Sequence, residues 1–238
     1  MNEPKYKRVV LKLSGEQFIG KREYGIDAEF LHWLANEIKQ AVAAGTEVII
    51  IVGGGNLLRG ESFSKNGIER TTADYMGMLA TIMNGMALTD VLEQNDQPTR
   101  LMTRLAASSV AEPYIRRRAL RHMEKGRVII LAGGTGNPYV TTDTAAVLAA
   151  SELGADAVLK ATKVDGVYDS DPAKNTDATK FDELKLSEAL ENENIRVMDK
   201  AAMAMAIEQR IPVVVFSLMD EGNIARVVAG EKIGTTVS

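Results

Sequence analysis

The chain has 238 residues and a formal net charge of -4, and 45% of its residues are hydrophobic, 25% charged and only 5% aromatic. This usage is that of a globular protein, which excludes disordered, collagen-like and coiled-coil classes, and the scarcity of aromatic residues disfavours a stacking surface for single-stranded nucleic acid. With no cysteine and two histidines, disulfides, thiolate catalysis and a cysteine or histidine metal cage are excluded, so any phosphate site must use Lys, Arg and backbone N–H groups.

The first residues, MNEPKYKRVVLKLSG, carry charge before a short apolar run and lack the features of a signal peptide. No apolar run approaches the length of a membrane span. We therefore expect a cytoplasmic protein that does not bind membranes.

Short β-branched runs then alternate with segments of helical periodicity, the pattern of a parallel α/β sheet covered by helices. A helix is expected over residues 27–45, capped by Asp27 and ended by Gly45. A second, over residues 72–94, is apolar on more than one face, so it lies either deep in one core or against a partner subunit. The expected strands are residues 8–13, 47–52, 127–132, 155–161 and 212–216.

No repeat or linker divides the chain. Residues 163–181, rich in Asp, Lys, Gly and Pro, are expected to form a loop that does not separate two domains. We expect a single domain, residues 1–238, with two lobes.

Glycine clusters follow three of the expected strands, beginning at Ser14-Gly15, Gly53 and Gly133. Each could be a tight turn. Three at the carboxyl ends of parallel strands favour a ligand site, because glycine lets backbone N–H groups approach phosphate oxygens.

Two familiar nucleotide-binding motifs fail. Gly15, Gly20 and Lys21 have P-loop spacing, but Arg22 stands where a magnesium-binding hydroxyl is needed. The dinucleotide motif fails because its third glycine is replaced in both candidate clusters.

Charged residues beside the clusters favour a phosphate site on another scaffold. Lys12 near the end of the first strand and Arg59 after the second could meet a polyphosphate, or be solvated surface charges. Thr141, Thr142 and Asp143 begin an apolar helical run, where free N–H groups suit an anion and Asp143 could hold a lysine or a magnesium ion. Plain capping is the alternative.

Six motifs occur in order: KLSGE, VGGGN, DYMGMLATIMNG, GTGNPYVTTD, LKATKVDGVYDSDP and VMDKAA. Together they make the chain resemble the bacterial uridylate kinases (UMP kinases) of the amino-acid kinase family, from about residue 5 to the C-terminus. The resemblance implies a three-layer α/β/α sandwich with a mostly parallel central sheet. It also implies Mg²⁺ carried with ATP, phosphoryl transfer to UMP giving UDP and ADP, and a homohexamer built as a trimer of dimers.

The resemblance assigns residues by position. Lys12, Arg59 and Asp143 resemble the transfer apparatus, and Asp199 is expected to orient Lys12. The acceptor lobe would span roughly residues 1–150 and the ATP-binding lobe 151–238. The ATP contacts implied are Lys12, Leu13, Ser14, Gly15, Gly55, Arg59, Thr162, Tyr168 and Asp171; the UMP contacts are Gly54, Asp74, Thr135, Gly136, Asn137, Pro138, Tyr139, Val140, Thr141 and Thr142.

Residues 20–25 (GKREYG) correspond to the family's loop for a GTP effector, and UTP is the other effector considered. No resident metal is expected. No general base is expected either, because the UMP phosphate is already ionised at neutral pH. Two alternatives stay open: a kinase of the same superfamily acting on a carboxylate or carbamate, and a non-catalytic uridine-nucleotide sensor. The basic residues 116–118, 121 and 125 spread around a predicted helix, so a solvated face or an effector contact is favoured over nucleic acid.

Overall fold

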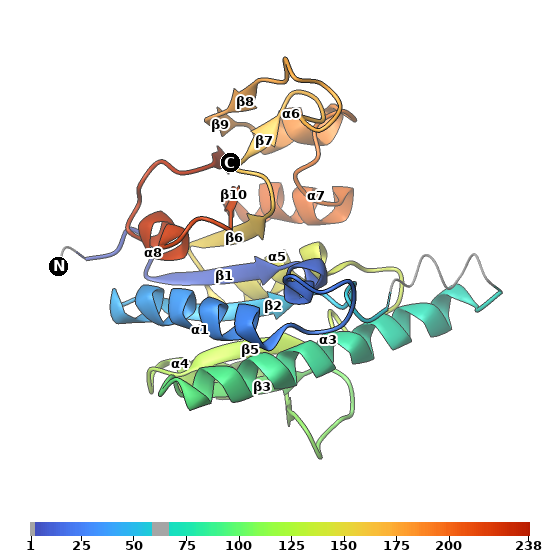
Figure 1. The fold of residues 1–238 in the computed structure, drawn as a ribbon, viewed down its shortest axis with the longest axis vertical. Helices are drawn as coiled ribbons and strands as arrows, with labels where there is room; N and C mark the ends of the chain where they lie inside the picture. The colour runs from blue at the N-terminus through green and yellow to red at the C-terminus, as the bar shows by residue number, and fades with distance from the viewer. Residues whose placement is uncertain (1–2, 59–66) are drawn as a thin grey trace.

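The computed structural model describes residues 3–58 and 67–238. Within them, a nine-stranded sheet has the order β4-β3-β5-β2-β1-β6-β10-β11-β9 (Figure 1). Neighbouring strands pair in parallel except β10 with β11, so the expected mostly parallel α/β sheet is confirmed. The strands are β1 (Arg8–Leu13), β2 (Glu47–Val52), β3 (Thr99–Thr103), β4 (Glu112–Pro113), β5 (Val128–Ala132), β6 (Ala157–Thr162), β9 (Glu183–Leu184), β10 (Val213–Ser217) and β11 (Thr235–Val237).

Helices cover both faces of this sheet and form the two outer layers of a sandwich (Figure 1). Side chains alternate along β1, so that Val9 and Leu11 pack with α1, whereas Val10 packs with α5 on the other face. Because the central strands are buried on both faces, they are continuous apolar runs in the sequence. One face carries α1 (Ala28–Ala43), α3 (Arg70–Gln94) and α8 (Asn223–Val228); the other carries α4 (Arg116–Met123), α5 (Thr142–Leu153), α6 (Leu186–Glu191) and α7 (Lys200–Gln209).

The cap predicted for α1 is present. The Asp27 carboxylate accepts hydrogen bonds from the N–H groups of Glu29 (3.0 Å) and Phe30 (3.3 Å), and Gly45 follows the helix with φ +94°. Such a cap satisfies N–H groups that have no partner within the helix.

Helix α3 is apolar on two faces, as expected. Its inner face buries Ile82 and Leu88, while Leu79 and Met83 on the outer face are 52% and 54% exposed. The outer face is therefore not part of this chain's own core.

Residues 163–181 differ from the expected loop. They contain β7 (Val167–Tyr168) and β8 (Lys180–Phe181), which form a separate antiparallel sheet. Polar contacts stabilise it: Asp165 accepts from the Tyr168 hydroxyl at 2.6 Å and from Lys180 at 3.1 Å. A strand of two residues is too short to show an alternation of apolar and polar side chains, so the sequence did not predict these strands.

In the described part of the chain, no helix has the length and apolar character to cross a membrane.

Candidate active site

The first two glycine clusters touch each other at the carboxyl ends of β1 and β2. Gly53 N–H donates to the carbonyl of Leu13 at 2.9 Å. A Cβ added to Gly15 would lie 2.5 Å from the nitrogen of Gly55, and one added to Gly53 would lie 2.6 Å from the nitrogen of Gly15. Any side chain would force the loops apart, so this contact requires glycine on both sides.

The third cluster follows β5, the neighbour of β2. Gly133 and Gly136 have φ values of +79° and +81°, which favour glycine. The N–H of Gly133 donates to the hydroxyl of Thr81 on α3 at 2.7 Å. The three clusters thus line one edge of the sheet, where open parallel sheets bind ligands.

Two lysines and one carboxylate lie beside these clusters. Lys12 of β1 and Lys160 of β6 are register partners, and their Nζ atoms lie 2.8 Å from Oδ1 and Oδ2 of Asp143 in α5. Lys160 also donates to the carbonyl of Val197 at 2.5 Å. The Lys12 contact is an ion pair. Among the described residues Asp143 is the partner of Lys12, so the ammonium keeps donors for a phosphate.

The charges of this cluster shift its pKa values. Burial would raise the pKa of Asp143, but the nearby ammonium groups of Lys12 and Lys160 outweigh it and hold the pKa below its ordinary value. Burial lowers the pKa of Lys160, while the Asp143 carboxylate opposes that shift. The carboxylate is therefore ionised at neutral pH and holds both amines in place.

Asp199 does not contact Lys12, contrary to the expectation that it orients this lysine. It caps α7, accepting from Ala202 N–H at 2.9 Å, and it accepts from the hydroxyls of Thr141 and Thr144. Asp143, which starts a neighbouring helix and faces the sheet, holds Lys12 instead. Asp199 thus joins the starts of α5 and α7.

Asp74 and Tyr139, both expected at the acceptor site, are joined. The N–H of Tyr139 donates to Asp74 Oδ2 at 2.8 Å, and Arg70 pairs with Oδ1 of the same carboxylate at 2.8 Å. Tyr139 has φ +66°, a conformation uncommon for a residue with a side chain. Its ring is 69% exposed and lies 5.6 Å from the Arg70 guanidinium.

The rest of the segment from Thr135 to Thr142 forms the loop between β5 and α5. Thr135 accepts from the N–H of Asn137 at 3.3 Å. The predicted helix start is present, and Thr141 caps it, which is the capping role that the sequence left as the alternative. Asn137 and Val140 are exposed. The loop therefore presents polar groups at the edge that holds Asp74.

On the other side, Tyr168 and Asp171 line a cavity of about 400 Å³ together with Val164 and Arg196. Thr162 ends β6 and donates to the carbonyl of Val164 at 2.6 Å, so it lies next to this cavity. The three residues expected on the adenosine side are thus brought near one another.

Three more residues expected to contact ATP are Ser14, Leu13 and Arg59. Ser14 caps the 3-10 helix η1 (Gly15–Ile19) in a capping box with Gln17. Leu13 is fully buried, so only its backbone faces the site. Arg59 lies outside the described residues.

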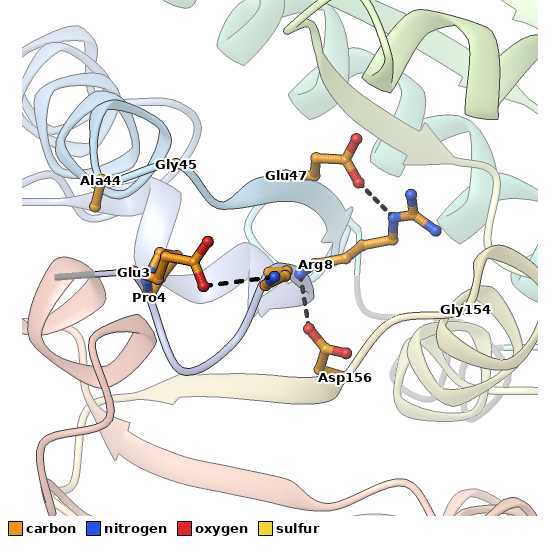
Figure 2. A pocket seen from close by; sticks show the side chains of 9 residues that line it. Glu3, Pro4, Arg8, Ala44, Gly45, Glu47, Gly154 and Asp156 are labelled. Carbon is orange, nitrogen blue, oxygen red and sulfur yellow. Dashed lines mark hydrogen bonds and ion pairs between the residues drawn. The ribbon is translucent and has the colours of Figure 1, made fainter.

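A larger cavity, about 660 Å³, lies at the opposite, amino ends of the strands (Figure 2). Its charged groups are paired with one another: Arg8 contacts Glu47 at 2.6 Å, its N–H donates to Asp156 at 2.9 Å, and Lys7 pairs with Glu3. The carboxylates Glu3, Glu47 and Asp156 outnumber its two cations, which disfavours a phosphate, so chemistry is assigned to the other edge.

The donor set fits a magnesium ion carried by a nucleotide. Within residues 3–58 and 67–238, no group of three or more His, Cys, Asp or Glu could hold a metal ion. Asp143, for which the sequence left lysine and magnesium open, holds lysines. Mg²⁺ bound to ATP takes most of its ligands from phosphates and water, so it needs no protein cage.

Sequence reasoning missed several residues. Lys160 was read only as part of a strand, although a lysine in a buried strand had singled out Lys12. Thr144 has no charge and lies outside the six motifs. Asn56, Thr81 and Asn84 lie within the motifs VGGGN and DYMGMLATIMNG, but nothing in the sequence shows that they are buried and bonded to the glycine loops.

A mostly parallel sheet with glycine loops and paired lysines at its carboxyl edge is typical of a phosphate-handling α/β enzyme. The amino acid kinase family matches residues 7–217, and the chain belongs to this family. It is a phosphotransferase.

Three solved structures are similar over nearly the whole chain. The UMP kinase of Bacillus anthracis is 40% identical, with a TM-score of 0.94 over 98% of this chain and 96% of that one. The UMP kinase of Ureaplasma parvum is 33% identical, with a TM-score of 0.92 over 100% of both chains. The uridylate kinase of Archaeoglobus fulgidus is 29% identical, with a TM-score of 0.72 over 97% of this chain and 99% of that one.

Proposed function

We propose that this enzyme transfers the γ-phosphoryl group of Mg²⁺-ATP to UMP, giving UDP and ADP, as a step of pyrimidine nucleotide biosynthesis. The observation that carries the proposal is the Lys12–Asp143–Lys160 cluster beside three glycine loops. The names of the three similar structures support UMP as the acceptor.

The chemistry needs little covalent help. A phosphate oxygen of UMP forms a bond to the γ-phosphorus while the bond from that phosphorus to the ADP oxygen breaks and its electron pair stays on ADP. No proton must be removed, because the attacking phosphate is already ionised. Positioning and neutralisation of charge on the transferred oxygens then supply the rate enhancement.

The chain's own groups supply that neutralisation. Lys12 and Lys160 donate to phosphate oxygens, Asp143 keeps both amines aimed at the site, and the glycine N–H groups add fixed dipoles. Arg59, outside the described residues, would add a further cation. Bound magnesium supplies positive charge that draws electron density from the phosphates.

The two nucleotides occupy the two sides of this cluster in our proposal. Adenosine lies along Thr162, Tyr168 and Asp171 beside their cavity, in a lobe from about residue 151 onward. The ATP phosphates meet Lys12, Leu13, Ser14, Gly15, Gly55 and Arg59; UMP meets Gly54, Asp74 and the loop from Thr135 to Thr142.

We further propose that the enzyme is a cytoplasmic homohexamer, with GTP and UTP as effectors and GTP contacting residues 20–25. Support for assembly comes from α3, where exposed apolar side chains recur at helical spacing. They are Tyr75, Leu79, Met83 and Met86.

One assay tests the reaction. ATP turnover is coupled to a signal for ADP and measured with UMP, CMP, TMP, aspartate and N-acetylglutamate, each with and without GTP and UTP. We expect rapid turnover with UMP. Turnover with an amino-acid carboxylate instead would assign the chain to another branch of its family, and UMP binding without turnover would make it a sensor.

A further inference from the structure

Helix α3 carries two buried polar side chains, Thr81 and Asn84, on the face that meets the sheet. Thr81 is 3% exposed and Asn84 is fully buried. They are three residues apart, so they lie side by side on one helix face. Each binds a different glycine loop of the active site.

Asn84 holds the loop after β2. Its amide donates to the carbonyl of Gly53 and to Asn56 Oδ1, both at 2.7 Å, and Asn56 donates back to Asn84 Oδ1 at 2.9 Å. Asn56 also donates to the carbonyl of Gly25 at 3.0 Å. The loop comes close to the helix, because a Cβ on Gly54 would lie 2.7 Å from the carbonyl oxygen of Gly77.

Thr81 holds the loop after β5. Its hydroxyl donates to the Met78 carbonyl and accepts from the N–H of Gly133, both at 2.7 Å. Gly133 begins the turn that leads to the loop expected to contact UMP. The hydroxyl is therefore the protein partner that fixes the start of this loop.

These side chains are poor choices for helix stability alone. An amide and a hydroxyl lose water on burial, and an apolar residue of similar size would serve the helix without that cost, but it would leave the Gly133 N–H or the Gly53 carbonyl without its partner. Thr89 on the same helix provides a comparison, since its hydroxyl donates only to the Gly85 carbonyl within α3 at 2.7 Å.

We propose that Thr81 and Asn84 are positioning residues which align the two glycine loops on one rigid helix. Thr81 sets the acceptor loop, and Asn84 sets the loop from Gly53 to Asn56, which serves both nucleotides. Neither side chain touches substrate. The kinetic part of this inference rests on the proposed UMP kinase reaction, whereas its structural part does not.

Amide hydrogen exchange of the full-length protein tests the structural part without any nucleotide. Thr81→Val keeps the shape and removes the hydroxyl, so we expect faster exchange in peptides covering residues 133–136 and unchanged exchange at residues 53–56. Asn84→Ala should give faster exchange at residues 53–56. Thr89→Val loses a hydrogen bond within α3, and Asn95→Ala loses bonds to Val91 and to His32 of α1 at the end of α3, so neither should change either loop.

Steady-state kinetics test the functional part. Thr81→Val should raise the KM for UMP about tenfold and leave the KM for ATP within about twofold, since an unsatisfied buried donor displaces only the acceptor loop. Asn84→Ala should raise both values. Thr81→Ser retains the hydroxyl and should restore wild-type kinetics. If Thr81→Val does not fold, Thr81→Ala provides the same comparison.

The outcomes separate the two proposals. A purely structural role would lower thermal stability and kcat per total protein while leaving both KM values unchanged, and that result, or unchanged loop exchange, would overturn this inference. A wild-type enzyme that does not phosphorylate UMP would overturn the proposed function, and the exchange experiment would still decide the role of Thr81.

Discussion

Lys12 and Lys160 lie opposite each other on adjacent parallel strands, and one carboxylate, Asp143, holds both ammonium groups at 2.8 Å. Register pairing places both side chains on the sheet face covered by α5, which carries Asp143. The pair of cations is thus built into the sheet, with its position fixed before substrate arrives.

Replacement of Lys12 by alanine should abolish turnover and leave the fold intact. The ammonium acts on developing phosphate charge, and loss of one such contact costs ~3 kcal/mol or more of transition-state stabilisation. Stopped assays of purified enzyme, with circular dichroism as the folding control, measure the effect. Normal turnover in a folded variant would contradict the assignment.

Asp143→Asn should lower kcat because neutral oxygen no longer holds the two lysines in position. The substitution preserves the size of the side chain, so the loss reflects charge. Rates are compared at saturating magnesium and ATP. An unchanged kcat under these conditions would remove Asp143 from the site.

Acid should weaken the protein through Asp143. Burial raises the pKa of this group, but the ammonium groups of Lys12 and Lys160 lower it by a larger amount. Its folded pKa therefore lies below the ordinary value. Its stabilising contribution is therefore full above the unfolded pKa, about 3.9, and is lost as pH falls through the folded pKa.

Urea unfolding between pH 3 and 7 checks this prediction, with Asp143→Asn as the reference that lacks the titrating group. The difference in unfolding free energy between wild type and reference should shrink toward acid pH. In Lys12→Met, one cation is gone and the folded pKa of Asp143 rises, so the loss of stability toward acid should be smaller and should be complete at a higher pH. A pH-independent difference would contradict the prediction.

The outer face of α3 should bury a subunit interface. Leu79→Glu introduces a charge at a side chain that is 52% exposed in the monomer, so it should reduce assembly without unfolding the chain. Light scattering should give the mass of six chains for wild type and a smaller mass for this variant. Ile207→Glu on α7 is the control, and a wild-type monomer at micromolar concentration would refute the prediction.

UMP should be preferred over CMP by roughly a hundredfold in kcat/KM. Uracil and cytosine present opposite donor and acceptor patterns, and two mismatched buried groups cost about 2 to 6 kcal/mol in total, a range that includes the roughly 2.8 kcal/mol of a hundredfold ratio. The margin over 2'-deoxy-UMP should be smaller, because it removes one hydroxyl from Asp74. Competition assays that offer two acceptors together measure both ratios. Equal kcat/KM values for UMP and CMP would contradict the prediction that the enzyme distinguishes uracil from cytosine.

The sequence predicted the elements whose signal is local. The β-branched runs became β1, β2, β5, β6 and β10, the Asp27 cap is present, and a helix begins at the predicted segment from Thr141 to Asp143, since each depends on neighbouring residues. The β7 and β8 hairpin was missed because its strands are too short to show alternation, and because contacts with distant residues, Lys180 with Asp165 and Val167 with Thr235, hold it together.

The candidate site was predictable only in part for a similar reason. Glycines at strand ends and Lys12 stand out along the chain, but the partner of Lys12 depends on which helix packs against β1. Resemblance suggested Asp199, and packing placed Asp143 there instead. Lys160 becomes visible only once the register of β1 with β6 is known.

The backbone contact between Gly15 and Gly53 limits how this enzyme can be redesigned. Because the two loops meet backbone to backbone, they offer no side chain that could be exchanged. Successive substitutions therefore cannot reshape the proposed phosphate site. In the proposed arrangement, a change of donor nucleotide must begin at the adenosine end, around Tyr168 and Asp171, where side chains line a cavity. Laboratory evolution of donor preference should therefore accumulate substitutions in the segment that contains β7 and β8. The glycine loops at Gly15 and Gly53 should stay unchanged.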